Sequence, residues 1–168
     1  LRGDTRFERV VIASPDKDLM QCVTGDRIVS WDRLRKTRYD EAGVVQKFGI
    51  RPPSIPDYLA LVGDTADGIP GVPRWGARSA STLLAQYGHL EAIPRRLEDW
   101  NVTVRGGAAL LASLIENESE VVLYRTLATL RLDVPLPHGF DDLEYRGPDA
   151  AQLAALVDES GERALDPT

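Results

Sequence analysis

The sequence predicts an α/β fold, in which part of a parallel sheet comes first and a mostly helical segment follows. The apolar run VVIA at residues 10–13 is continuous and β-branched, which is typical of a strand buried in a parallel sheet. Beyond residue 64, apolar residues instead recur with the helical period, as over 107–116 and 118–130. The two parts are separated by GDTADGIPGVPRWGARS, which is dense in glycine and proline.

The first part of the chain contains two expected strands and two short helices. Residues 10–13 form the first strand, and RIVSW at 27–31 forms the second after a turn at 25–26. Asp40 has the side chain of a helix N-cap, and the helix that it starts ends at Gly49. Prolines at 52, 53 and 56 interrupt the chain before a short helix over 57–62.

The second part contains a series of amphipathic helices. One helix is expected over 77–87 and ends at Gly88. Two more follow at 107–116 and 118–130, and a last one lies near 149–158, after a proline-rich acidic stretch. The residues expected on the apolar faces of the two middle helices are Leu110, Leu111, Leu114, Val121, Leu123 and Leu127.

Length, charge and cysteine content restrict the class of protein. The chain has 168 residues, enough for one core and a small subdomain, and a net charge of −6. Residues 131–168 hold nine acidic residues against three arginines, whereas 27–38 and 71–97 are basic. No apolar run is long enough to span a membrane and no signal peptide is visible, so we expect a cytoplasmic protein. The single cysteine, Cys22, excludes an internal disulfide and is expected to be buried and unreactive.

Two pairs of aspartates have the spacing of a metal site. Asp16 and Asp18 follow the first strand, at the edge where open α/β sheets place their sites. Asp64 and Asp67 lie at i, i+3 on one side of a glycine-rich turn. Four carboxylates favour Mg²⁺ or Mn²⁺, and zinc is not expected because neither loop has a histidine. The alternative for the first pair alone is a solvent-exposed turn, and Lys17 between them is expected to point away from the metals.

The segment GVPRWGARSASTLL predicts an anion-binding surface. A glycine- and proline-rich hairpin opens there onto a helix N-terminus, whose N–H groups bind phosphate without sequence preference. The candidate phosphate-binding residues are Gly71, Val72, Arg74, Trp75, Gly76, Arg78 and Ser79. An ordinary loop-to-helix junction is the alternative, and Trp75 either packs under the hairpin or stacks on a nucleotide.

These motifs together resemble a known family. VVIASPDKDLMQCV and GIRPPSIPDYLALVGDTADGIPGVPRWGARSASTLLAQYGHLEAI are similar to the 5′-nucleases, meaning the 5′→3′ exonucleases and flap endonucleases. That family includes the nuclease domain of bacterial DNA polymerase I. The resemblance implies a PIN-like α/β nuclease core over 1–63, a helix–three-turn–helix DNA-binding subdomain over 64–130, and an acidic tail with a final helix over 131–168.

The resemblance also implies a function. Asp16, Asp18, Asp64 and Asp67 match family carboxylates that help to hold two divalent ions, Mg²⁺ or Mn²⁺, which activate a water. Residues 71–87 match the element that grips duplex or 5′-flap DNA by its backbone, independently of sequence, and that can hold a potassium ion.

The chain also departs from the family pattern. Arg74 and Trp75 replace smaller residues of the family's turn, and the family's first half, which supplies further acids and a helical arch, has no counterpart here. We therefore expect the carboxyl-terminal half of a 5′→3′ exonuclease, free-standing and monomeric, that cleaves at or near background by itself. The alternatives are a non-catalytic duplex-DNA-binding module and a PIN-like ribonuclease.

Overall fold

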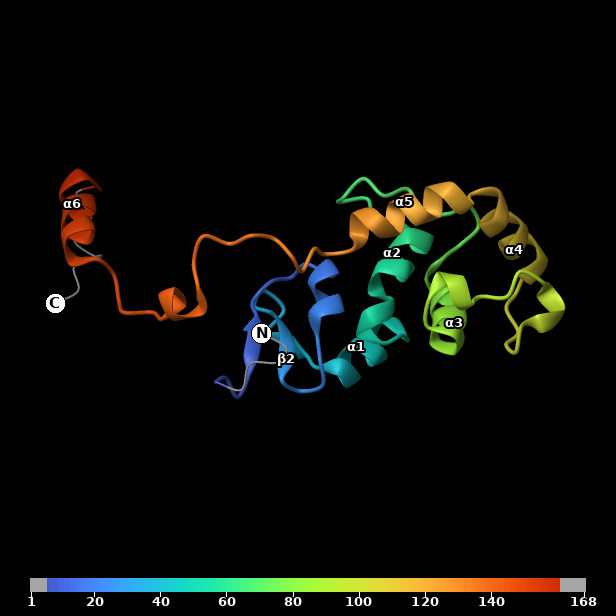
Figure 1. Cartoon of the computed structure of the whole chain (residues 1–168), viewed down its shortest axis with the longest axis horizontal. Helices are drawn as coiled ribbons and strands as arrows, with labels where there is room; N and C mark the ends of the chain where they lie inside the picture. The colour runs from blue at the N-terminus through green and yellow to red at the C-terminus, as the bar shows by residue number, and fades with distance from the viewer. Residues whose placement is uncertain (1–5, 161–168) are drawn as a thin grey trace. The chain divides into compact units, whose positions relative to one another are not determined.

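The computed structural model describes residues 6–160 and divides the chain into two units, Leu1–Leu130 and Arg131–Thr168. Each unit is described by itself. The first holds all three strands and the helices α1 to α5 (Figure 1). The division of this unit near residue 64 stays a prediction.

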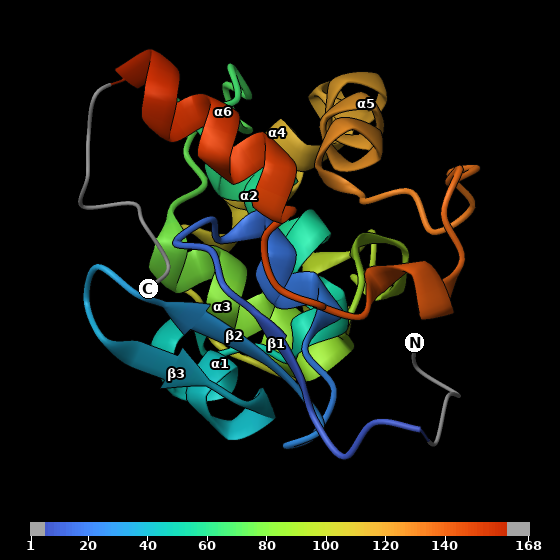
Figure 2. The same ribbon diagram turned by 90° about the vertical axis from the view of Figure 1, so that its left-hand side faces the viewer.

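The sheet of the first unit has three short strands in the order β1-β2-β3. β1 (Val10–Ile12) pairs parallel with β2 (Ile28–Asp32), and β2 pairs antiparallel with β3 (Thr37–Tyr39), as Figure 2 shows. Two strands and part of a parallel sheet were predicted, whereas β3 was not. β2 is buried along most of its length, but Val11 of β1 is 41% exposed because β1 is an edge strand among the described residues. The continuous burial expected for the first strand is therefore wrong.

Two helices follow the sheet and begin as local rules require. α1 (Glu41–Phe48) is capped by Asp40, whose Oδ1 accepts from the Gly43 N–H at 2.7 Å, and it ends at Gly49 with φ 72°. α2 (Ile55–Val62) begins two residues before the expected start. Proline explains the difference. It fits the first turn of a helix, because the backbone N–H that proline lacks would have no intrahelical partner at that position.

Three more helices complete the first unit: α3 (Ala77–Tyr87), α4 (Gly107–Glu116) and α5 (Glu118–Ala128). Both α3 and α5 contact α2, and α4 contacts α5. The core includes Leu59, Leu61, Leu83 and Leu84.

The predicted apolar faces of α4 and α5 are only partly correct. Leu110, Leu111, Leu114 and Val121 are buried, as predicted. Leu123 and Leu127, in contrast, are 54% and 66% exposed, so their predicted burial is wrong. α5 is held against α2 by a different face, to which Val121 and Ala128 belong.

The second unit, Arg131–Thr168, contains a 3₁₀ turn at Phe140–Leu143 and α6 (Ala150–Ser160). Asp149 caps α6, because its Oδ1 accepts from the N–H groups of Ala151 and Gln152 at 2.9 and 3.0 Å. The final helix was predicted within two residues of these bounds. None of the described helices has the length and apolarity needed to cross a membrane.

Candidate metal centre and nucleic-acid interface

The loop after β1 orders its aspartates through local hydrogen bonds. Asp16 N–H donates to Ser14 Oγ at 3.2 Å, and Asp18 N–H donates to Asp16 Oδ1 at 3.0 Å. Asp18 then opens the 3₁₀ helix η1 (Asp18–Cys22), in which Cys22 is partly exposed, contrary to prediction. Asp18 Oδ1 is buried and accepts no hydrogen bond from the described residues. A buried carboxylate oxygen without a donor suits a cation ligand, because leaving it unpaired costs free energy.

The second pair of aspartates lies on a tight turn after α2. The backbones of Asp64 and Ile69 exchange two hydrogen bonds of 2.8 Å, which close the turn. Gly63 and Gly71 flank the turn with φ 88° and 78°, and a Cβ on Gly71 would lie 2.6 Å from the Gly63 nitrogen. Only glycine at both positions lets the two backbones touch, and this contact fixes where Asp64 and Asp67 emerge.

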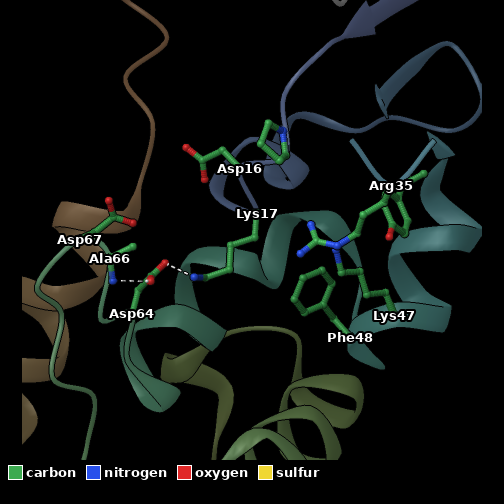
Figure 3. Close-up of a pocket in the computed structure, with 10 residues that line it drawn as sticks. Asp16, Lys17, Arg35, Lys47, Phe48, Asp64, Ala66 and Asp67 are labelled. Atoms are coloured by element: carbon green, nitrogen blue, oxygen red, sulfur yellow. Dashed lines mark hydrogen bonds and ion pairs between the residues drawn. The ribbon is translucent and has the colours of Figure 1, made fainter. Parts of the chain in front are cut away.

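The two loops bring three carboxylates together. Oxygens of Asp18, Asp64 and Asp67 all lie within 4.8 Å of one another. Asp16 is exposed and stands outside this group of three, but it lines the same cavity as Asp64 and Asp67, as Figure 3 shows. Among the described residues, this acidic cluster is the one group whose carboxylate oxygens could share a metal ion.

Lys17 does not point away from the cluster, and that prediction is wrong. Its Nζ forms an ion pair with Asp64 Oδ2, drawn as a dashed line in Figure 3. The prediction assumed an extended loop in which side chains alternate. Lys17 instead has φ −73° and ψ −25°, the conformation of a helical turn. Its side chain therefore turns to the same side as the carboxylates.

Burial and mutual repulsion shift the pKa values of the cluster. Burial, followed by the charges of Asp16, Asp67 and Asp64, raises the pKa of Asp18 to about 6. The pKa of Asp67 is raised by burial and then by its hydrogen bond with Asp64. Burial also acts to raise the pKa of Asp64, but Lys17 and the Ala66 N–H outweigh it, and the net direction is downward. A hard divalent cation would relieve this repulsion, and the all-oxygen donor set fits such an ion.

The predicted hairpin residues divide into buried and exposed sets. Val72 and Trp75 are buried, and Trp75 Nε1–H donates to the Leu110 carbonyl at 3.1 Å, so the indole packs under the hairpin. The backbone N–H groups of both residues are also used internally, by the Leu61 and Val72 carbonyls. Gly71 makes the close backbone contact with Gly63 that was described above. The side chains of Val72 and Trp75 therefore belong to the core.

The other predicted residues, which are exposed or partly exposed, line a cavity of about 650 Å³ at the start of α3. Gly76 N–H donates to Ser79 Oγ at 3.1 Å, which closes the first turn of the helix. Arg74, Arg78 and Arg105 line the cavity and have no carboxylate partner among the described residues. Arg105 was not predicted, since it comes from the loop before α4 and no local motif marks it. The three arginines thus place three positive charges around one cavity.

Comparison with known proteins identifies the class to which this fold and site belong. Residues 50–151 match the family described as 5'-3' exonuclease, C-terminal SAM fold. The match covers more than half of the chain, and the chain therefore belongs to the 5'-3' exonuclease family.

Individual relatives agree with this assignment. DNA polymerase I of Pseudomonas aeruginosa is 40% identical over 152 residues, which cover 89% of this chain and 16% of the polymerase. A 5'-3' exonuclease of Aquifex aeolicus is 31% identical over 157 residues, covering 94% of this chain and 51% of the exonuclease. The chain thus spans about half the length of that exonuclease and a smaller share of the polymerase.

A solved structure shows the same fold. The bacteriophage T5 flap endonuclease, in a pseudo-enzyme-product complex with DNA and metal ions, superposes with a TM-score of 0.59 at 16% identity. The superposition covers 73% of this chain and 43% of the endonuclease. It confirms the predicted α/β nuclease fold.

Proposed function

We propose that this chain supplies the metal-binding carboxylates and the duplex-gripping surface of a 5′ nuclease that hydrolyses phosphodiester bonds in DNA. The observation that carries the proposal is the convergence of Asp18, Asp64 and Asp67 from two separate loops, within 4.8 Å, in a chain of the 5'-3' exonuclease family. Nothing in the packing of the fold requires three carboxylates so close together, and their repulsion opposes folding.

The residues of the acidic cluster have distinct parts in this proposal. Asp18, Asp64 and Asp67 would hold a divalent ion, Mg²⁺ or Mn²⁺, and Asp16 would complete the ligand set from the rim of the cavity. Such an ion, when bound, supplies an activated water and stabilises the charge that develops on the scissile phosphate. Lys17 keeps the buried Asp64 ionised, because it lies against the carboxylate and lowers its pKa.

The substrate in this proposal is DNA, bound through its backbone. Arg74, Arg78 and Arg105 offer cations that have no carboxylate partner in the described part of the chain, and the first turn of α3 offers N–H groups. Contacts of this kind position a duplex without reading its sequence. Binding should therefore be insensitive to sequence and should weaken steeply with salt, as counterion release requires.

Metal and DNA binding by the chain test the proposal. Because the chain spans about half the length of the Aquifex exonuclease, binding is the primary readout and release of nucleotides from a 5′-labelled duplex the second. Calorimetric titration with Mn²⁺ should show a site that Asp67→Asn weakens on the order of tenfold or more, because one ligand charge is lost. Asp26→Asn, an exposed aspartate outside the cluster, is the matched control. Equal Mn²⁺ affinity in both variants would exclude the metal site.

Competition separates the remaining alternatives. Duplexes of unrelated sequence should bind alike and should displace one another at every salt concentration. Stronger displacement by RNA would favour a ribonuclease. Tight DNA binding without any Mn²⁺ site would leave a DNA-binding module with no catalytic part.

A further inference from the structure

The cavity beside the acidic cluster has two chemically different sides. It has a volume of about 630 Å³, within the range of about 300–1,000 Å³ typical of small-ligand sites. Asp16, Asp64 and Asp67 line one side. The other side, here called the Lys47 side, is lined by Arg35, Tyr39, Lys47 and Phe48. Figure 3 shows Arg35, Lys47 and Phe48 across the cavity from Asp64 and Asp67.

Lys47 carries a positive charge that no carboxylate of the described residues neutralises. It lies in the last turn of α1 and is exposed. Its Nζ sits over the Tyr39 ring at 4.4 Å and the Phe48 ring at 5.2 Å from their centroids. Within residues 6–160, no carboxylate forms an ion pair with it. The two rings therefore hold the ammonium in place while its charge stays available to an anion from the cavity.

Arg35 is fixed beside Lys47 in a different way. The buried Asp32 accepts from the Arg35 backbone N–H at 2.9 Å and from its Nη1 at 2.7 Å. The Arg35 side chain is nevertheless 70% exposed, so its other N–H groups remain accessible. A guanidinium anchored on one edge presents the opposite edge in a constant direction, as recognition of a phosphate requires.

Phe48 provides an apolar surface next to these cations. Its ring packs edge-on against Tyr58, at 5.5 Å and 74°, and remains partly exposed. Its backbone carbonyl accepts a hydrogen bond of 2.5 Å from Ser81 Oγ of α3. This bond connects the end of α1 to α3, the helix whose first turn lines the cavity of Arg74, Arg78 and Arg105. Cations beside aromatic rings are the combination that binds single-stranded nucleic acid, where phosphates alternate with bases.

We propose that the Lys47 side binds the nucleotide adjoining the one held at the acidic cluster. Lys47 and Arg35 would contact its phosphate, and Phe48 its base or sugar. The inference rests on the proposed function, since it needs a strand of DNA to enter the cavity. Its physical reason is charge: the acidic cluster repels phosphate unless a cation intervenes, whereas the Lys47 side attracts the next phosphate directly.

Fluorescence anisotropy with two labelled DNAs tests this proposal. One is a blunt duplex, and the other is the same duplex with a short 5′ single-stranded extension, both in buffer with Ca²⁺. In the wild-type chain the extension should tighten binding. Lys47→Ala should weaken binding of the extended DNA about fivefold and lower its salt slope by about 1, with little effect on the blunt duplex. Lys47→Arg, which keeps the charge, should retain the affinity.

Lys36→Ala is the matched control. Lys36 is an exposed lysine between β2 and β3 that does not line the cavity, so both DNAs should bind this variant as they bind wild type. The inference is overturned if the extension adds no affinity, or if Lys47→Ala weakens both DNAs equally. In either case the proposed function still stands as long as the blunt duplex binds and Asp67→Asn loses Mn²⁺. Failure of the wild-type chain to bind either DNA would overturn both proposals.

Discussion

Replacing Asp18 by asparagine should stabilise the metal-free chain. Asp18 is partly buried beside three other aspartates, and its pKa is raised from 3.8 to about 6 by burial and by their charges. The ionised form is therefore more costly in the folded chain than in the unfolded chain. Asparagine has nearly the same shape without the charge, so the substitution removes the cost and leaves the loop intact.

The size of the effect follows from the pKa. Each pKa unit corresponds to about 1.4 kcal/mol, so a rise from 3.8 to about 6 corresponds to about 3 kcal/mol at most. Solvent at the exposed edge of Asp18 screens part of this, which leaves an expected gain of about 1–2 kcal/mol. At about 2–4 °C per kcal/mol, the melting temperature should rise by roughly 2–8 °C at pH 7.5.

The pH dependence has a definite sign. The folded chain holds the Asp18 proton more tightly than the unfolded chain, so wild-type stability falls as pH rises from about 4 to about 6. The advantage of Asp18→Asn should be complete above about pH 6 and should vanish below about pH 4. Urea denaturation of both proteins at several pH values, in the presence of EDTA, measures this difference in the free energy of unfolding.

Two further results bear on the same reasoning. Mn²⁺ should raise the melting temperature of wild type, and Asp18→Asn should lose most of that rise. Asp26→Asn is the matched control, because Asp26 is an exposed aspartate outside the cluster and should change neither the stability nor the response to Mn²⁺. An Asp18→Asn variant that is no more stable than wild type at neutral pH would refute the electrostatic account of the cluster.

Two more substitutions test the framework around the site. Gly71→Ala would place a Cβ 2.6 Å from a backbone nitrogen at φ 78°, and should cost roughly 2–4 kcal/mol in urea denaturation. Gly25→Ala, also at positive φ but with nothing within 4 Å, should cost less. Trp75→Phe removes the donor to a buried carbonyl and should cost about 1–3 kcal/mol by the same measurement, without changing the Mn²⁺ affinity.

Features set by local rules could be predicted from the sequence. The Asp40 cap depends on the backbone of its own first turn, and the observed bond to Gly43 confirms it. The glycine-rich turn expected around Asp64 and Asp67 is present, and its two ends meet at Gly63 and Gly71. The pairing of Asp64 with Asp67 on one turn follows from the same local geometry. Such features need no knowledge of distant residues.

Features that depend on the conformation of an irregular loop could not be predicted. Lys17 was placed by assuming alternation, a rule that holds only for extended backbone, whereas its loop turns as a 3₁₀ helix. Leu123 and Leu127 share a helical face in the sequence, but a helix buries only the face that its neighbours cover. α2 covers another face of α5. Neither outcome is encoded within a few residues.

The Lys47 side of the cavity is formed only by the tertiary fold, and it shares the cavity with the aspartates. The basic character of 27–38 was visible in the sequence, but only the antiparallel pairing of β3 brings Arg35 and Tyr39 to Lys47. The charged side chains that line the cavity balance, with Asp16, Asp64 and Asp67 against Lys17, Arg35 and Lys47. A bound divalent cation makes this lining net positive, and we therefore expect it to favour the entry of a phosphate strand. Because coupling between two binding sites is reciprocal, DNA in the cavity should in turn tighten the binding of the metal.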